Sequence, residues 1–185
     1  MPSPYVAARQ RPQHTGKNRI APLLLCLLFA LMTACATQPP ATGPSFVVVR
    51  HAEKMTDDPR DPVLTDAGHA RAAALAASLA DVPLIAIYAT AYRRTQQTAA
   101  PSARTHGLTV LTYDARQPAA DFVARLKRTH HHGTVLVVGH SNTVPDIAAA
   151  LCVCVVAPMN EAQYGRRLTI RVDADGVATL TQSHD

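Results

Sequence analysis

The sequence predicts an α/β fold in which helices cover both faces of a largely parallel central sheet, a three-layer α/β/α sandwich. Two observations lead to this prediction. Short apolar runs rich in valine alternate with alanine-rich segments of helical period from residue 46 onward. The runs are apolar at consecutive positions, which is typical of strands buried on both faces of a sheet. The length of 185 residues suits one such domain.

The first half of the domain alternates between strands and helices. Residues 46–50 form the first predicted strand, with three consecutive valines. Residues 65–79 form a helix, because Leu75 and Leu79 lie one turn apart in an alanine-rich run. Residues 84–88 form the second strand, and residues 93–105 form a helix that ends at Gly107.

The second half continues the alternation and then closes with a hairpin. Residues 108–113 form the third strand, and residues 119–128 form a helix in which Phe122 and Leu126 are four residues apart. Residues 134–138 form the fourth strand, followed by a helix over residues 143–151 that tolerates Pro145 in its first turn. Residues 168–172 and 177–181 flank a short Asp- and Gly-containing turn, which predicts a hairpin.

The basic excess of the chain is concentrated at its start. The formal net charge is +5, and residues 1–34 contain four Lys or Arg residues and no acidic residue. The remainder is near neutral, so the charge predicts no nucleic-acid binding. A basic stretch up to Arg19, followed by an apolar run over residues 20–34, has the layout of a signal peptide and is too short to span a bilayer.

The end of this leader resembles the lipobox of bacterial lipoproteins. In the segment LMTAC, Cys35 would become the lipidated first residue after cleavage. The expected domains are then a signal peptide over 1–34, a proline-rich linker over 35–45 and a folded domain over 46–185. Ala36 follows the cysteine, which by resemblance to sorted lipoproteins places the protein in the bacterial cell envelope, on the periplasmic face of the outer membrane. The alternatives are an uncleaved anchor, or ordinary cleavage beside an incidental cysteine.

Two further cysteines, Cys152 and Cys154, remain in the domain. A Cys-x-Cys pair closes a small ring that strains a disulfide, and zinc would need a second ligand pair. We therefore expect two unbonded, mostly buried apolar side chains.

Three polar clusters follow predicted strands, at residues 50–54, 90–94 and 139–142. Ligands of open parallel sheets bind beyond the carboxyl ends of the strands, so we expect Arg50, His51, Arg94 and His140 to converge. Guanidinium groups grip phosphate through paired hydrogen bonds, and a neutral imidazole can attack phosphorus directly. The residues predict a phosphate pocket that needs neither a metal nor another cofactor.

Four segments resemble the motifs of the histidine phosphatase superfamily, whose fold is phosphoglycerate-mutase-like. RHAEK at residues 50–54 resembles its Arg-His-Gly signature, with alanine in place of glycine. LTDAG at residues 64–68 is similar to its Leu-Thr-x-x-Gly segment, and TAYRRTQQTA at residues 90–99 is similar to its Ser-x-x-x-Arg-Thr-x-Gln-Thr-Ala segment. GHS at residues 139–141 is similar to its Gly-His segment. The four segments occur in order and are specific together.

The resemblance implies His51 as the nucleophile that carries the phosphoryl group. It implies Arg50, Arg94 and His140 as the phosphate pocket. Arg94 is chosen over its neighbour because it directly precedes the Thr-x-Gln-Thr sequence.

Other side chains are expected around this core. Members of the family often carry a carboxylic acid that protonates the leaving oxygen, and Asp114 and Glu53 are both candidates that the pattern does not separate. Ser141 and Asn142, directly after His140, are expected to contact the substrate. The three consecutive histidines at residues 130–132 are expected to form an exposed loop rather than a metal site.

The resemblance implies a metal-independent phosphomonoester hydrolase that acts through phosphohistidine. Its expected substrate is a phosphorylated small molecule outside the cytoplasm, and its expected contact with the membrane is through the lipid anchor alone. Two alternatives remain open: a protein phosphohistidine phosphatase, and a non-catalytic lipoprotein that binds phosphorylated ligands. The sequence determines neither the substrate nor the oligomeric state.

Overall fold

The computed structural model describes residues 43–184, all within a compact unit that spans Pro40–Asp185. The expected signal peptide, Cys35 and the expected linker up to residue 42 lie outside the described residues. The helices and strands are β1 (Ser45–Arg50), α2 (Asp66–Ser78), β2 (Leu84–Thr90), α3 (Arg93–His106), β3 (Val110–Tyr113), α4 (Ala119–Thr129), β4 (Thr134–Gly139), α5 (Val144–Cys152), β5 (Arg166–Val172) and β6 (Ala178–His184). None of the described helices is both long and apolar enough to cross a membrane.

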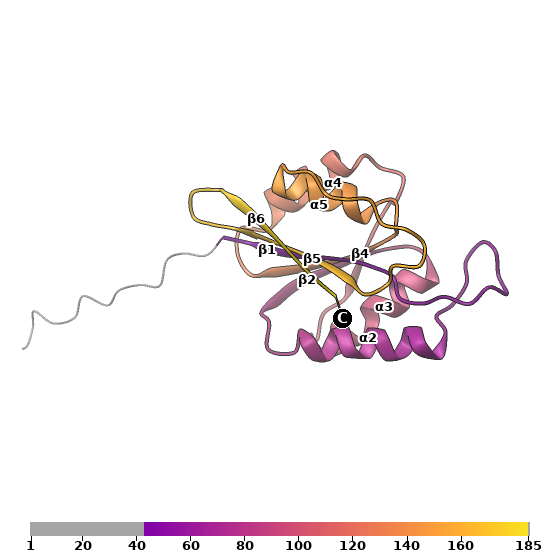
Figure 1. Cartoon of the computed structure of the whole chain (residues 1–185). Helices are drawn as coiled ribbons and strands as arrows, with labels where there is room; N and C mark the ends of the chain where they lie inside the picture. The colour runs from indigo at the N-terminus through magenta and orange to yellow at the C-terminus, as the bar shows by residue number, and fades with distance from the viewer. Residues whose placement is uncertain (1–42, 185) are drawn as a thin grey trace, which may run out of the picture. The chain divides into compact units, whose positions relative to one another are not determined.

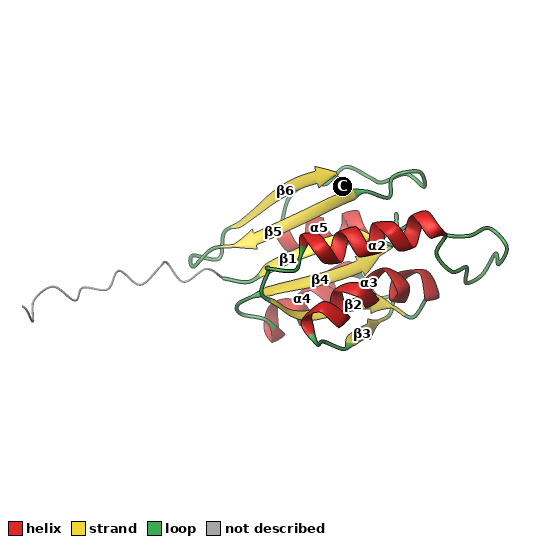
Figure 2. Cartoon of the chain, turned by 90° about the horizontal axis from the view of Figure 1, so that it is seen from below, coloured by secondary structure: helices red, strands yellow, loops and turns green. Residues whose placement is uncertain are grey.

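The strands form one six-stranded sheet in the order β3-β2-β4-β1-β5-β6. The pairs β1–β4, β2–β4 and β2–β3 are parallel, whereas β5 runs antiparallel to both β1 and β6. Figure 2 shows the β5–β6 hairpin along one edge of the sheet and β3 along the other. The predicted largely parallel sheet with a closing hairpin is confirmed.

Helices cover both faces of the sheet, with α2 and α3 on one side and α4 and α5 on the other (Figure 1). Alternate residues of β1 face the two layers. Phe46 and Val48 belong to the core under α4 and α5, and Val47 and Val49 belong to the core under α2 and α3. All four are at most 5 % exposed, which explains why the strand is apolar at consecutive positions. The three-layer α/β/α architecture follows.

Local signals place the helix ends where the sequence predicts them. The Thr65 hydroxyl caps α2 by accepting a hydrogen bond from the Gly68 amide at 3.1 Å. Gly107 ends α3 in the left-handed conformation, with φ 63°. Pro145 lies in the first turn of α5, where its missing N–H costs nothing.

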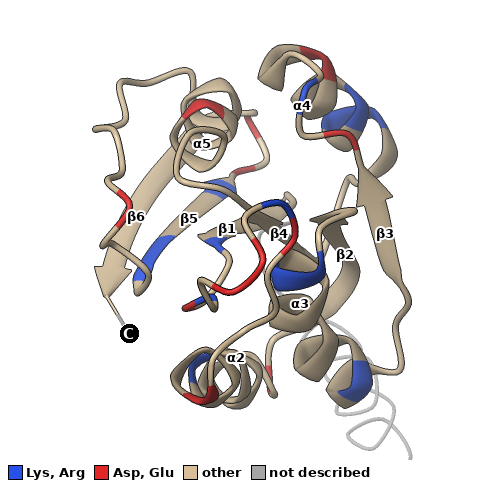
Figure 3. Ribbon diagram, turned by 90° about the vertical axis from the view of Figure 1, so that its right-hand side faces the viewer, with Lys and Arg blue, Asp and Glu red and all other residues tan. Residues whose placement is uncertain are grey.

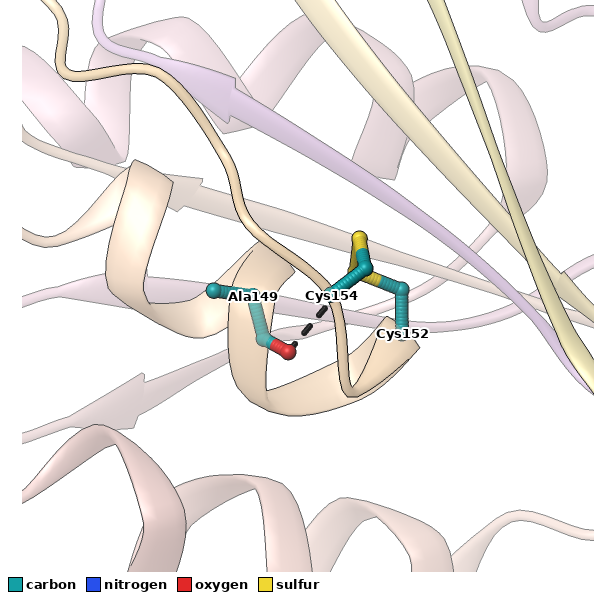
Figure 4. The surroundings of a disulfide bond; sticks show 3 residues. All are labelled: Ala149, Cys152 and Cys154. Atoms are coloured by element: carbon teal, nitrogen blue, oxygen red, sulfur yellow. Dashed lines mark hydrogen bonds between the residues drawn. A yellow bond between two sulfur atoms is a disulfide. The ribbon is translucent and has the colours of Figure 1, made fainter.

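The cysteine prediction is wrong, because Cys152 and Cys154 form a disulfide (Figure 4). Val153, between them, adopts the left-handed conformation with φ 53° and ψ 43° at the end of α5. This turn brings the two Cα atoms to 5.2 Å, within the usual range for a disulfide, whereas an extended chain would hold them about 7 Å apart. The same turn lets the Cys154 amide donate to the Ala149 carbonyl.

The histidine tract is also more structured than expected. His131 and His132 are exposed, as predicted, but His130 is buried at 9 % exposure. Its Nε2 lies 3.0 Å from the Tyr88 hydroxyl. Within residues 43–184, no group of three or more His, Cys, Asp or Glu side chains is arranged to hold a metal ion.

Candidate active site

The loops that follow β1, β2 and β4 meet at the carboxyl edge of the parallel strands, which Figure 3 views nearly end-on. They enclose a pocket of about 310 Å³. Its lining combines two histidines with three cations and one carboxylate: His51, Lys54, Tyr92, Arg94, Ala115, Arg116, His140, Ser141, Asn142, Thr143 and Glu161. The pocket therefore lies at the edge of the sheet that the sequence predicts. Residues that are far apart in the sequence line it together.

His51 follows β1 directly and is 3 % exposed. Its Nδ1 lies 2.8 Å from the Ala52 carbonyl oxygen. A carbonyl can only accept, so Nδ1 carries the proton and donates it, and Nε2 keeps its lone pair. Burial, followed by the charges of the arginines and of His140, lowers the pKa of His51 from 6.5 to about 3. His51 is therefore a neutral imidazole with its Nε2 open for attack.

His140 follows β4, and its ring contacts that of His51 edge-on, with centroids 5.4 Å apart. Its Nε2 lies 3.0 Å from the Thr90 hydroxyl, at the end of β2. Burial lowers the pKa of His140 to about 4, with a smaller contribution from Arg94 and Arg50. The second histidine is thus also neutral at pH 7.

Two arginines border the histidines with unsatisfied donors. Nε of Arg50, and both Nε and Nη1 of Arg94, are buried without a hydrogen-bond partner among the described residues. The only carboxylate within ion-pair range of Arg94 in this part of the chain is Asp61, at 3.8 Å. Buried N–H groups without acceptors are uncommon in proteins, and guanidinium N–H groups are the donors that bind phosphate oxygens. The arrangement fits an oxyanion.

Aromatic rings fix the planes of both guanidinium groups. The Arg94 guanidinium lies over the Tyr92 ring at 4.3 Å, and the Arg50 guanidinium lies over the Tyr164 ring at 4.2 Å. Sequence reasoning missed both tyrosines, although Tyr92 lies inside one of the quoted motifs.

Arg50 is not itself among the pocket-lining residues, because a loop between α5 and β5 holds its guanidinium. Nη1 donates to the carbonyls of Asn160, Glu161 and Gln163 at 3.2, 2.8 and 3.4 Å. Nη2 donates to Oε2 of Glu161 at 2.7 Å. The predicted convergence of Arg50 with the other site residues is indirect, since Glu161 lies between Arg50 and the pocket.

Sequence reasoning missed Glu161. Its carboxylate lines the pocket, pairs with Arg50 and accepts a short hydrogen bond from the Ser141 hydroxyl. The predicted topology could have indicated that the loop with Glu161 lies near the site. The strand after this loop is antiparallel to β1, so the loop that precedes it lies at the carboxyl edge of the parallel strands.

The two carboxylates that the sequence offered as proton donors lie outside the pocket lining. Glu53 forms a bidentate pair with Arg71 of α2, with N···O distances of 2.7–3.0 Å. Asp114 is an exposed residue after β3 that pairs with Arg116 at 3.2 Å. The structure does not bring either carboxylate into the pocket lining, although Arg116, the partner of Asp114, belongs to it.

Other motif residues build the frame of the site. The Thr98 hydroxyl accepts a hydrogen bond from the Ala52 amide at 3.0 Å and so fixes the loop that carries His51. Gln97 accepts from the Leu64 amide at 2.8 Å. Thr95 is fully buried, and its hydroxyl lies 2.8 Å from that of Thr90, which in turn orients His140.

The part of the chain that contains His51 and Arg94 is similar to a known protein family. Residues 46–116 match the family model described as the histidine phosphatase superfamily, branch 1. No curated protein sequence matches the chain.

Several solved structures share the fold. A structure of the protein histidine phosphatase SixA with tungstate is 20 % identical, with a TM-score of 0.61 over 76 % of this chain and 96 % of that one. YhfR of Bacillus stearothermophilus is 18 % identical, with a TM-score of 0.63 over 77 % and 97 %. A mycobacterial glucosyl-3-phosphoglycerate phosphatase is 15 % identical, with a TM-score of 0.60 over 77 % and 98 %. The chain therefore shares the fold of these structures, and its residues 46–116 are similar to the histidine phosphatase superfamily.

Proposed function

We propose that this protein hydrolyses phosphate monoesters through a phosphohistidine at His51, without a metal ion. One observation carries the proposal. A neutral imidazole with a free Nε2 lines the same pocket as Arg94, whose two buried N–H groups lack acceptors. The similar SixA structure holds tungstate, which is a tetrahedral oxyanion like phosphate, and this likeness supports an oxyanion pocket here.

The geometry accounts for both halves of the reaction. Nε2 of His51 attacks phosphorus, while the Ala52 carbonyl stabilises the positive charge that develops on the ring. Arg94, with Arg50 behind Glu161, provides the positive charge that balances the phosphoryl oxygens, as metal ions do in other phosphatases. Water then attacks the phosphohistidine and restores the neutral imidazole.

The expected substrate is a phosphorylated small molecule outside the cytoplasm. The signal-peptide pattern and lipobox resemblance of residues 1–35 support this location. The Cys152–Cys154 disulfide supports it independently, because disulfides persist in oxidising compartments such as the periplasm. We propose a lipid-anchored enzyme on the periplasmic face of the outer membrane.

The test compares His51→Asn with a control, His69→Asn, on the purified domain with p-nitrophenyl phosphate and EDTA present. His69 is exposed on α2 and does not line the pocket, so its replacement leaves activity unchanged. His51→Asn lowers kcat/KM by at least about a thousandfold, because no other group can form the covalent intermediate. Rapid acid-free quenching of the wild type traps a phosphorylated histidine that the His51→Asn variant lacks.

Two results would count against the proposal. Wild-type activity that requires an added divalent ion contradicts the metal-free mechanism. A wild type that binds phosphate but turns over no monoester in a broad panel supports the non-catalytic alternative. The panel includes a phosphohistidine peptide, whose selective hydrolysis would favour the protein phosphohistidine phosphatase.

A further inference from the structure

We propose that Glu161 is the acid that protonates the leaving oxygen, a role that rests on the proposed phosphatase function. The starting observation is its position. It contributes the carboxylate to the lining of the pocket that contains His51 and His140. The two acidic residues that the motifs suggested for this role do not line the pocket: Glu53 pairs with Arg71, and Asp114 pairs with Arg116.

The loop that carries Glu161 is held firmly, although the carboxylate itself is 75 % exposed. Arg50, which is 2 % exposed, donates to three carbonyls of residues 160–163. Arg166 is also buried, and its Nη1 donates to the carbonyls of Ala157 and Pro158 at 2.8 and 3.2 Å. Two buried arginines thus fix the backbone of the loop, whereas the Glu161 side chain is exposed and is held through its carboxylate by Arg50 and Ser141.

Before substrate binds, the Glu161 carboxylate is ionised. The hydrogen bond from Ser141, followed by the charge of Arg50, lowers the pKa of Glu161. The other charged or titratable groups that face it are His51, Lys54 and His140. Oε2 of Glu161 accepts a hydrogen bond from Nη2 of Arg50, and Oε1 accepts one from the Ser141 hydroxyl. The carboxylate thus uses two hydrogen-bond donors that a phosphate oxygen could also use.

Substrate binding reverses this situation. A phosphate dianion that enters beside Arg94 and competes for Arg50 puts a second negative charge next to the carboxylate. Like charges in one site favour protonation of one of them, so Glu161 takes a proton from solvent as the substrate binds. The residue is then an uncharged acid at the wall of the pocket, within the group of side chains that surrounds the phosphoryl group.

Glu161 gives up one proton in the first step and regains one in the second. In the first step the bond from Nε2 of His51 to phosphorus forms, the ester P–O bond breaks, and the Glu161 proton passes to the leaving oxygen. In the second step water attacks phosphorus, the N–P bond breaks, and the Glu161 carboxylate takes the proton of the attacking water. Inorganic phosphate leaves, with His51 neutral and Glu161 protonated again.

Dependence on the leaving group separates proton donation from a positioning role. We compare kcat/KM, which reports the steps up to cleavage of the P–O bond, for glycerol 2-phosphate and for p-nitrophenyl phosphate. Glu161→Gln lowers the value for glycerol 2-phosphate by at least about a hundredfold, because an alkoxide needs protonation. It lowers the value for p-nitrophenyl phosphate by less than about fivefold, because nitrophenolate leaves without an acid. Glu161→Asp, which keeps a carboxyl, recovers part of the glycerol 2-phosphate activity.

The control is Asp175→Asn, in the turn of the β5–β6 hairpin, which leaves both values unchanged. An equal loss on both substrates in Glu161→Gln would show a positioning role only and overturn the proposal, as would unchanged or increased activity. A selective loss in Asp114→Asn instead would assign the acid to Asp114. A wild type that is inactive on both substrates would refute the phosphatase function itself, which is a different outcome from any of these.

Discussion

His51 illustrates how a residue acquires its chemistry from its neighbours. In water a histidine is partly protonated near pH 6.5, and a protonated imidazole cannot attack phosphorus. Here the Ala52 carbonyl fixes the proton on Nδ1, and burial disfavours a second proton. The charged state is further disfavoured by Arg50, His140 and Arg94. The site therefore keeps the imidazole of the proposed nucleophile neutral over a wide pH range.

This environment has a measurable consequence for the titration of the two site histidines. In ring NMR titrations between pH 8 and pH 5 we expect His51 and His140 to remain neutral, since their pKa values lie at about 3 and about 4. Assignments come from His51→Asn and His140→Asn. A midpoint near 6.5 for either ring would contradict the proposed environment.

The lowered pKa values of His51 and His140 also make the free energy of unfolding depend on pH. The unfolded chain binds these protons near pH 6.5 and the native state does not, so protonation favours unfolding. The contribution of each neutral histidine to the free energy of unfolding is full well above pH 6.5, and it falls from that plateau by about 2 kcal/mol at pH 5. In denaturant unfolding, the His51→Asn variant should therefore lose less unfolding free energy than the wild type as the pH falls to 5.

At the scale of elements, the site depends on how α2 approaches the loop after β1. Gly68 lies in the first turn of α2, and a Cβ built there would come within 2.2 Å of the Glu53 carbonyl oxygen. The Thr65 amide donates to that same carbonyl at 2.9 Å. The glycine of the Leu-Thr-x-x-Gly segment thus lets α2 pack closely against the loop that carries His51.

We therefore expect Gly68→Ala to disturb both stability and activity. The backbone on one side must move, which costs about 1–3 kcal/mol and displaces the loop that carries His51. The matched control is Gly107→Ala at the end of α3, where φ is 63° but a Cβ would meet nothing within 4 Å. It should lose about 1 kcal/mol and keep its kcat/KM. Equal kcat/KM in both variants would show that the contact at Gly68 does not position the site.

At the scale of the whole molecule, the proposed activity and the proposed location depend on separate parts of the chain. The candidate site is built from residues 50–164, whereas the proposed location rests on the pattern of residues 1–35. Two or more acyl chains give a stable membrane anchor, at about 0.8 kcal/mol for each buried methylene. The enzyme would then stay at the membrane surface without a transmembrane helix.

This separation predicts the outcome of Cys35→Ser. The variant should leave the membrane fraction while its kcat/KM stays at the wild-type value, because the pocket of the described residues is lined by side chains from His51 to Glu161. Mass spectrometry of the wild type should find a mature chain that begins at a diacylglyceryl Cys35. A soluble wild-type protein, or a different first residue, would refute the lipoprotein proposal and leave the phosphatase proposal standing.

The sequence by itself determined the layers of this protein and the edge of the sheet where its site lies. Consecutive apolar residues such as those of β1 can be satisfied only between two layers of helices. Polar side chains directly after parallel strands must meet at one edge, so His51, Arg94 and His140 could be placed from spacing alone. These are local properties of the chain, and each can be read within a few residues.

Only the tertiary structure decided which carboxylate faces the nucleophile and what the cysteines do. Glu161 is 110 residues from His51 in sequence, as the numbering shows, and it reaches the pocket because two buried arginines hold its loop. Glu53, two residues from His51, is instead held by Arg71 of α2. Cys152 and Cys154 meet because Val153 adopts a left-handed turn. Side-chain pairing and backbone reversal depend on contacts with distant segments, which a local pattern does not contain.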